Sequence, residues 1–88
     1  MRLTKKEIEV IKEVFKGKKV ILFGSRVDNN VKGGDIDLFI DEDLHLKDVI
    51  KYKVKLLEKL GVQKIDLVSR RYASKELLDE IRKKGIVL

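Results

Sequence analysis

Two carboxylates stand two residues apart, at Asp35 and Asp37, inside a segment that alternates between apolar and acidic residues. The alternation predicts a strand over 35–41, and side chains two apart on a strand emerge on the same face. Adjacent carboxylates repel, and each disfavours ionisation of the other. A divalent cation removes this conflict, and Mg²⁺ takes oxygen ligands, typically one or two carboxylates with substrate phosphates. Taken alone, the pair also fits an ordinary solvated strand face.

Upstream of this pair, Gly24 and Ser25 follow four consecutive apolar residues, Val20 to Phe23. Such a run predicts a central strand that is buried on both faces. Glycine lets the backbone turn sharply and lets a ligand approach closely. Backbone N–H groups beyond it, at the start of a helix or turn over 26–30, would form an anion site, to which the serine hydroxyl adds a donor. The alternative is a simple strand-ending turn. Combined with the carboxylates, however, this is the minimum equipment for phosphoryl or nucleotidyl transfer.

Asp66 is the third candidate, on the strand predicted for Lys64 to Ser69. If that strand neighbours the strand over 35–41, its carboxylate can join the first two. Three carboxylates can hold two Mg²⁺ ions roughly 4 Å apart, clamping the attacking and leaving oxygens of a displacement. The alternative is a surface aspartate paired with Lys64 or Arg70.

Three helices must support these strands. The first is expected over Leu3 to Lys16, where Thr4 and Glu7 form a capping box, and Gly17 supplies a left-handed residue after it. The second runs over about 46–60 and ends at Gly61. Its expected apolar stripe comprises Val49, Ile50, Val54, Leu56, Leu57 and Leu60.

The third helix is expected from Ser74, its N-cap, through Lys84, and ends at Gly85. Residues 86–88 follow as a short apolar tail that fits an edge strand. This order predicts an α/β (α+β) fold, in which helices pack on one small mixed sheet of three to four strands. We expect residues 1–88 to form a single domain.

Composition narrows the functional classes. The chain has 88 residues, no cysteine, one histidine and a net charge of +6. A disulfide framework, a thiolate metal site and a cysteine nucleophile are therefore excluded. No stretch approaches the ~20 apolar residues of a membrane span, so we expect a soluble, cytoplasmic protein. The positive charge favours phosphate-bearing partners, but the lysines are spread over every segment and few aromatics are available to stack on bases. A nucleic-acid groove is disfavoured for that reason.

Three motifs in this order resemble the DNA polymerase β-like nucleotidyltransferase superfamily: Leu22 to Ser25, Asp35 to Leu38, and Ile65 to Leu67. The small size is similar to that of the minimal nucleotidyltransferases, often called MNT proteins, and the resemblance covers roughly residues 3 to 88. Gly33 and Gly34 depart from the Ser or Thr often found before the carboxylates, which puts one local hydrogen bond in doubt.

The resemblance implies a role for each matching residue. Gly24 and Ser25 would bind the β- and γ-phosphates of the nucleotide, with Arg26 a further phosphate contact or a plain surface arginine. Asp35 and Asp37 would ligate two Mg²⁺ ions. Asp66 would ligate the catalytic metal and help to deprotonate the attacking hydroxyl, which displaces pyrophosphate from ATP. Arg70, Arg71, Lys32 and His45 are assigned to the surface.

Minimal members are commonly encoded beside a HEPN-domain protein as a toxin–antitoxin pair. The nucleotidyltransferase is the antitoxin there, and some transfer AMP to a tyrosine of the toxin. The resemblance therefore implies a type VII-like antitoxin with a HEPN partner, as a homo- or hetero-oligomer. Three alternatives stay open: neutralisation by occlusion without catalysis, transfer to a small-molecule hydroxyl, and a basic nucleic-acid binder, for which no stacking platform is visible.

Overall fold

Three helices and four strands make up the fold in a computed structural model that describes residues 1–30, 34–61 and 64–88. The helices and strands, in chain order, are α1 (Lys5–Val14), β1 (Val20–Phe23), β2 (Ile36–Ile40), α2 (Leu46–Leu60), β3 (Ile65–Ser69), α3 (Lys75–Lys84) and β4 (Ile86–Val87). Two short 3₁₀ turns, η1 (Gly24–Val27) and η2 (Arg70–Tyr72), follow β1 and β3. The predicted mixed fold class is confirmed, including the edge strand at the C-terminal end. Among the described helices, none has the length and apolarity that crossing a membrane requires.

The strands form one mixed sheet in the order β3-β2-β1-β4. β1 runs antiparallel to both β2 and β4, whereas β2 and β3 are parallel. β1 is an interior strand with all four residues buried, as the apolar run predicts. The parallel pairing needs a long crossover, which α2 supplies. β2 and β3 are therefore neighbours, which is the condition on which the role of Asp66 depends.

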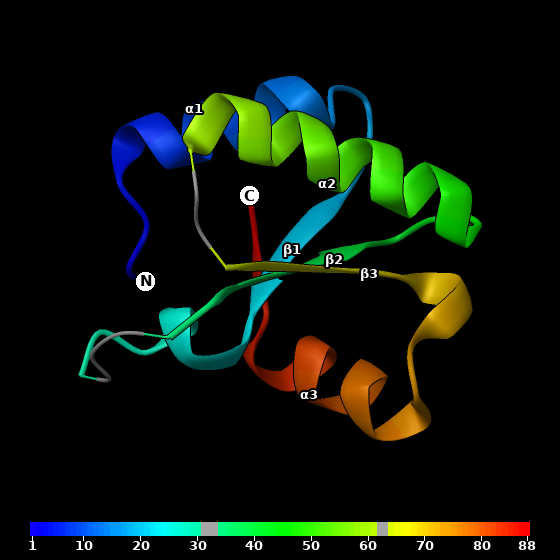
Figure 1. The fold of residues 1–88 in the computed structure, drawn as a ribbon. Coiled ribbons are helices and arrows are strands. Elements are labelled where there is room, and N and C mark those ends of the chain that lie inside the picture. Colours follow the sequence, from blue (N-terminus) through cyan, green and yellow to red (C-terminus); the bar gives the residue numbers. More distant parts are fainter. Residues whose placement is uncertain (31–33, 62–63) are drawn as a thin grey trace.

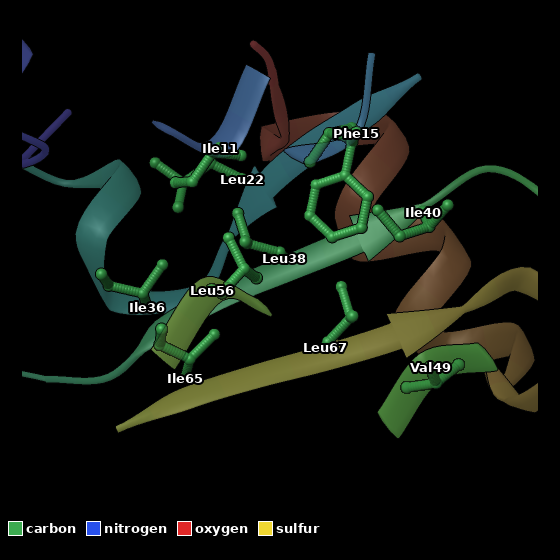
Figure 2. Close-up of a cluster of buried hydrophobic side chains, with 11 residues drawn as sticks. Ile11, Phe15, Leu22, Ile36, Leu38, Ile40, Val49, Leu56, Ile65 and Leu67 are labelled. Atoms are coloured by element: carbon green, nitrogen blue, oxygen red, sulfur yellow. The ribbon is translucent and has the colours of Figure 1, made fainter. Parts of the chain in front are cut away.

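Helices cover the two faces of the sheet unequally. Figure 1 shows α1 and α2 together over one face and α3 alone over the other. The first face carries the larger core, drawn in Figure 2. Its buried residues are Ile11, Phe15, Val20, Leu22, Ile36, Leu38, Ile40, Val49, Leu56, Ile65 and Leu67. The second face buries Ile21, Phe23, Phe39 and Ile81. Alternate residues of the same strands supply both clusters.

The helix ends largely follow the predicted chemistry. At α1, the Thr4 hydroxyl accepts from the Glu7 N–H at 3.1 Å and the Glu7 carboxylate accepts from the Thr4 N–H at 2.8 Å, which is the predicted capping box. At α3, the Ser74 hydroxyl accepts from the Leu77 N–H. Gly17 has a φ of +82°, as predicted, but α1 itself ends earlier than Lys16, at Val14.

The predicted apolar stripe of α2 is wrong at two positions. Val49 and Leu56 are buried, and Leu57 and Leu60 pack beside them. Ile50 and Val54 instead lie on the outer side of the helix, with about half of each side chain exposed. The reason is the position of the strand that α2 packs on. β3 is the last strand on its side of the described sheet, so no further strand covers the outer side of α2.

Candidate active site

Asp37 and Asp66 lie directly opposite each other across the parallel pairing of β2 and β3. Two residues further along each strand, Phe39 and Val68 lie on the same face of the sheet and pack with α3. The two aspartates are therefore on the face of the sheet that α3 covers. They lie near the starts of β2 and β3, beyond Phe39 and Val68 and outside the small apolar cluster that packs with α3. Asp37 is half-buried and Asp66 is exposed. The predicted meeting of these two residues is what the structure shows.

The environment of Asp37 disfavours its charged form. Its pKa is raised from 3.8 to about 6, first by burial, then by the Asp66 carboxylate, which also makes a hydrogen bond with it, and then by Asp35 and Glu80. These causes place Asp35 and Asp66 within electrostatic reach of Asp37. They also add Glu80 of α3, which the sequence analysis did not identify. Strongly perturbed carboxylates of this kind are typical of functional sites.

Gly24 brings the turn after β1 directly against Asp37. Its φ is +77°, a conformation that residues with a Cβ rarely adopt. A Cβ placed on Gly24 would lie 2.2 Å from Oδ2 of Asp37. Only glycine therefore fits here on both counts, since it permits the turn and leaves room for the carboxylate. The segment that follows is the 3₁₀ turn η1, at the position where a short helix or turn was predicted.

Gly34 makes a second close approach, this time to Ser25. Its φ is +90°, and a Cβ at this position would lie 2.1 Å from the Ser25 Oγ. The departure from Ser or Thr at this position thus has a steric reason, because a side chain would displace the serine. The sequence signal was the glycine itself, placed just before the carboxylates. The other glycine of that pair, Gly33, lies outside the described residues.

Arg26 makes hydrogen bonds to the backbone of two other segments. Its Nε donates to the Gly34 carbonyl at 3.3 Å, and its Nη1 donates to the Arg2 carbonyl at 3.0 Å. The Arg2 N–H donates in return to the Arg26 carbonyl at 2.7 Å. Arg26 thus fastens the N-terminal segment and the loop before β2 to the turn. Its predicted contact with a nucleotide stays a prediction.

The residues assigned to the surface follow that assignment where the structure describes them. Arg70 and Arg71 pair with Asp41 and Asp43 at 3.0 and 3.1 Å. The alternative pairing of Arg70 with Asp66 is therefore not the one that forms. His45 precedes α2 and is exposed. Lys32 lies outside the described residues.

Two hollows flank the carboxylates. A pocket of about 260 Å³ lies beside the glycine turn and is lined by Gly24, Ser25, Val27, Asp28, Glu80 and Lys84. A separate groove of about 350 Å³ is lined by Asp35, Lys53, Leu57, Lys64, Ile65 and Asp66. Sequence reasoning missed Glu80 and Lys84. They stand four apart on α3, so they share a helix face, but only the docking of α3 shows which face meets the turn.

The donor set suits a magnesium ion in its chemistry. Asp35, Asp37 and Asp66 offer carboxylate oxygens, and Mg²⁺ needs only one or two of these when substrate phosphates supply the remainder. Across residues 1–30, 34–61 and 64–88, no group of three or more His, Asp or Glu side chains is already arranged to hold a metal ion. The three aspartates as metal ligands therefore stay a prediction.

Comparison with known protein families identifies the fold. The family described as "Polymerase beta, Nucleotidyltransferase" matches residues 5–88, nearly the whole chain. The chain belongs to this family. The four-stranded mixed sheet with its glycine turn and paired aspartates is accordingly a polymerase β-like nucleotidyltransferase core. A search of curated proteins found no match.

Solved structures share this core. Two are crystal structures of mutants of the toxin–antitoxin MntA–HpeT. The first is 24% identical to this chain with a TM-score of 0.75, and the second is 21% identical with a TM-score of 0.74. The matches include 99% and 97% of this chain, respectively, and 72% of each solved chain. A third is a tri-AMPylated Shewanella oneidensis HEPN toxin in complex with MNT antitoxin, with a TM-score of 0.65 and 24% identity over 91% of this chain and 63% of that one. At these identities the likeness is one of fold.

Proposed function

We propose that this nucleotidyltransferase-family chain transfers AMP from ATP to a hydroxyl of a HEPN-domain protein, a tyrosine in our expectation, and thereby acts as a cytoplasmic antitoxin. The observation that carries the proposal is the pairing of Asp37 with Asp66 beside the Gly24 pocket. A triphosphate requires cationic and N–H groups, whereas an attacking hydroxyl requires a carboxylate base. The pocket beside Gly24 offers Lys84 and the N–H groups of the turn, and the groove at Asp66 offers the carboxylate.

The roles of the residues follow from their positions. Gly24 lets the phosphates approach the backbone, Ser25 donates a hydroxyl hydrogen bond, and Lys84 adds positive charge to the same pocket. Asp66, exposed in the groove, accepts the proton of the attacking hydroxyl. The oxygen forms a bond to the α-phosphorus, the bond from that phosphorus to the bridging oxygen of the β-phosphate breaks, and pyrophosphate leaves. Mg²⁺ held by Asp35, Asp37 and Asp66 would supply positive charge beside the phosphates.

The partner is inferred from the structures that share the fold. Each of them is a toxin–antitoxin complex, and one contains a HEPN toxin that carries three AMP groups. The groove lined by Asp35 and Asp66 is open to solvent, so an acceptor carried by another protein can reach it. Protein adenylylation is therefore consistent with both the open site and the complexes that share the fold.

Neutralisation of the HEPN toxin by binding alone is the second candidate function, because the solved structures that share the fold are complexes of a toxin with its antitoxin. The intact Asp37–Asp66 pair beside the glycine turn supports catalysis as the first proposal.

The test is transfer of label from ATP to a HEPN-domain toxin. We expect label from [α-³²P]ATP but none from [γ-³²P]ATP, because AMP is transferred and pyrophosphate is released. Asp66→Asn should reduce the rate about 10²–10⁴-fold, the usual effect of losing a general base. Asp43→Asn is the matched control, since Asp43 is an exposed partner of Arg71, away from the site.

Two results would contradict the proposal. Labelling that survives Asp66→Asn would remove the assigned base. Absence of any label, together with full neutralisation of the toxin by Asp66→Asn, would leave binding as the function.

A further inference from the structure

The outer side of α2 carries an apolar stripe that nothing in the described structure covers. Leu46, Ile50 and Val54 stand four residues apart, so their side chains follow one another along one helix face. They are 58%, 51% and 46% exposed, and the stripe is about 12 Å long at 1.5 Å per residue. Tyr72 of η2, 53% exposed, extends it beyond Leu46, whose N–H donates to the tyrosine oxygen at 3.0 Å. Single exposed apolar residues are common, but a contiguous row marks an interaction surface.

The stripe leads directly to the carboxylates. Val54 and Ile50 stand three residues before Leu57 and Lys53, which line the groove together with Asp35 and Asp66. Residues three apart on a helix are neighbours on its surface. In Figure 1, α2 lies along the sheet on the side of β3, which is the last strand at that edge among the described residues. A molecule seated on the stripe is therefore beside the groove in which Asp66 is exposed.

The charges at the border of the stripe are mainly positive and favour one kind of occupant. Lys47 and Lys51 stand next to Leu46 and Ile50 along the helix, Lys53 borders the groove, and Glu58, four residues after Val54, adds one negative charge. An apolar centre with a basic border is complementary to an apolar surface bordered by carboxylates. A second copy of this chain would bring a second set of lysines to the same mainly basic surface, and like charges disfavour that contact. An amphipathic helix with acidic flanks fits, because such helices bind apolar faces of this kind through residues three and four apart.

We propose that the stripe of Leu46, Ile50 and Val54 docks an acidic amphipathic helix of the protein acceptor, and that the adjoining groove receives the acceptor hydroxyl. This inference rests on the proposed transfer to a protein. It divides the site into two sides: the pocket at Gly24 takes the nucleotide, and the groove at Asp66 takes the acceptor. Docking through α2 thereby determines which hydroxyl reaches the site.

The test measures binding separately from transfer. The Asp37→Asn variant is used as the background, because it blocks transfer and leaves the groove residues unchanged. Its affinity for the HEPN-domain toxin that is used in the transfer assay is measured by calorimetry, with and without Ile50→Glu. We expect Ile50→Glu to weaken binding at least tenfold, since it places a carboxylate against an apolar, acid-flanked helix. Val87→Glu is the matched control, because Val87 is 60% exposed on β4 at the opposite edge of the sheet and should leave binding unchanged.

A charge reversal tests the basic border independently. Lys51→Glu should weaken binding several-fold, whereas Lys75→Glu, at the start of α3 on the other face of the sheet, should not. Thermal melts followed by circular dichroism show whether each variant is folded.

Three binding results would overturn the docking surface: no binding by the unmodified stripe, equal binding by Ile50→Glu, or self-association of the chain that Ile50→Glu abolishes. Binding that follows the prediction without any transfer by the wild-type chain leaves the docking surface standing and removes the proposed activity. Transfer by Ile50→Glu at the wild-type rate removes the docking surface alone.

Discussion

The two faces of the sheet are made from alternate residues of the same strands, yet they differ in almost every physical respect. On the face under α1 and α2, β2 contributes Ile36, Leu38 and Ile40, all fully buried. On the face under α3, the same strand contributes Asp37 and Phe39, of which only Phe39 is covered. One face is a closed apolar core. The other is apolar where α3 packs on Phe39 and carries solvent-accessible carboxylates two residues earlier on the same strands.

This difference shows how so short a chain can carry a charged site. The first face supplies most of the apolar burial, so the second face need not be sealed along its whole length. The uncovered end of β2 and β3 keeps its carboxylates partly solvated, and that limits the destabilisation caused by their mutual repulsion. Stability and chemistry are thus separated by the alternation of side chains along single strands.

The largest expected effect is a loss of stability from a substitution in the closed face. Leu38→Ala removes a fully buried side chain adjacent to Asp37, and we expect a loss of about 2–5 kcal/mol in the free energy of unfolding. Val68→Ala, a partly buried residue on the other face, should have a clearly smaller effect, about 1 kcal/mol or less. Urea denaturation followed by circular dichroism measures both. Equal losses would show that the two faces contribute equally to stability.

The next expected effect is a loss of transfer activity from a substitution at the open face that leaves the core unchanged. Gly24→Ala and Gly17→Ala both place a Cβ at positive φ, which costs about 1–2 kcal/mol in each case. Only at Gly24 does the Cβ meet Asp37, since no atom lies within 4 Å of the Cβ position at Gly17. We therefore expect Gly24→Ala alone to reduce transfer, by about 10²-fold if the carboxylate is displaced by 1 Å.

Transfer rates for the two alanine variants, compared at equal folded fraction, decide this prediction. If Gly17→Ala lowered the rate as much as Gly24→Ala does, loss of stability rather than displacement of the carboxylate would be the cause.

Sequence reasoning anticipated the chemistry of the open face better than its boundaries. The capping box, the buried strand β1 and the same-face spacing of Asp35 and Asp37 are local properties, and the sequence shows them directly. That Asp66 meets Asp37 was conditional on β2 and β3 being neighbours, which the family resemblance suggested and the parallel register confirms.

The features that sequence reasoning missed depend on how separate elements pack. Glu80 enters the site only because of the angle at which α3 crosses the sheet, and nothing in its local sequence indicates that. Ile50 and Val54 have helical spacing suited to a core, but the sheet ends at β3 and leaves them exposed. Helical periodicity shows that apolar side chains share one side of a helix, but it does not show whether another element packs against that side.

A smaller effect concerns the pH dependence of stability. The pKa of Asp37 is about 6 in the folded protein against 3.8 for an unperturbed aspartate, so the folded state binds more protons between these values. Its contribution is therefore most favourable below pH 4 and is lost as the pH rises through 6. We expect a loss of about 1 kcal/mol, because solvent screening at this partly exposed group reduces the full effect of the shift.

Asp37→Asn isolates this contribution. The difference in the free energy of unfolding between wild type and variant, measured from pH 4 to 8 without metal, should change over this interval and level off above about pH 7. An unchanging difference would mean that Asp37 has an ordinary pKa.

The smallest effect sharpens the comparison at the border between the α3 cluster and the carboxylates. Glu80 is the last of the groups that raise the pKa of Asp37, so Glu80→Gln should lower that pKa by a few tenths, as expected for two partly solvated charges. Asp79→Asn is the matched control on the same helix, because Asp79 pairs with Arg82 and is not among the causes of the shift. Carboxyl ¹³C titration of Asp37 in metal-free protein measures both variants. A shift of equal size in both variants would mean that the net charge of α3, rather than the position of Glu80, acts on Asp37. A shift confined to Glu80→Gln would mean that Glu80 itself acts on the carboxylate of Asp37. Within α3, Ile81 would then belong to the apolar core, and the adjacent Glu80 would belong to the site.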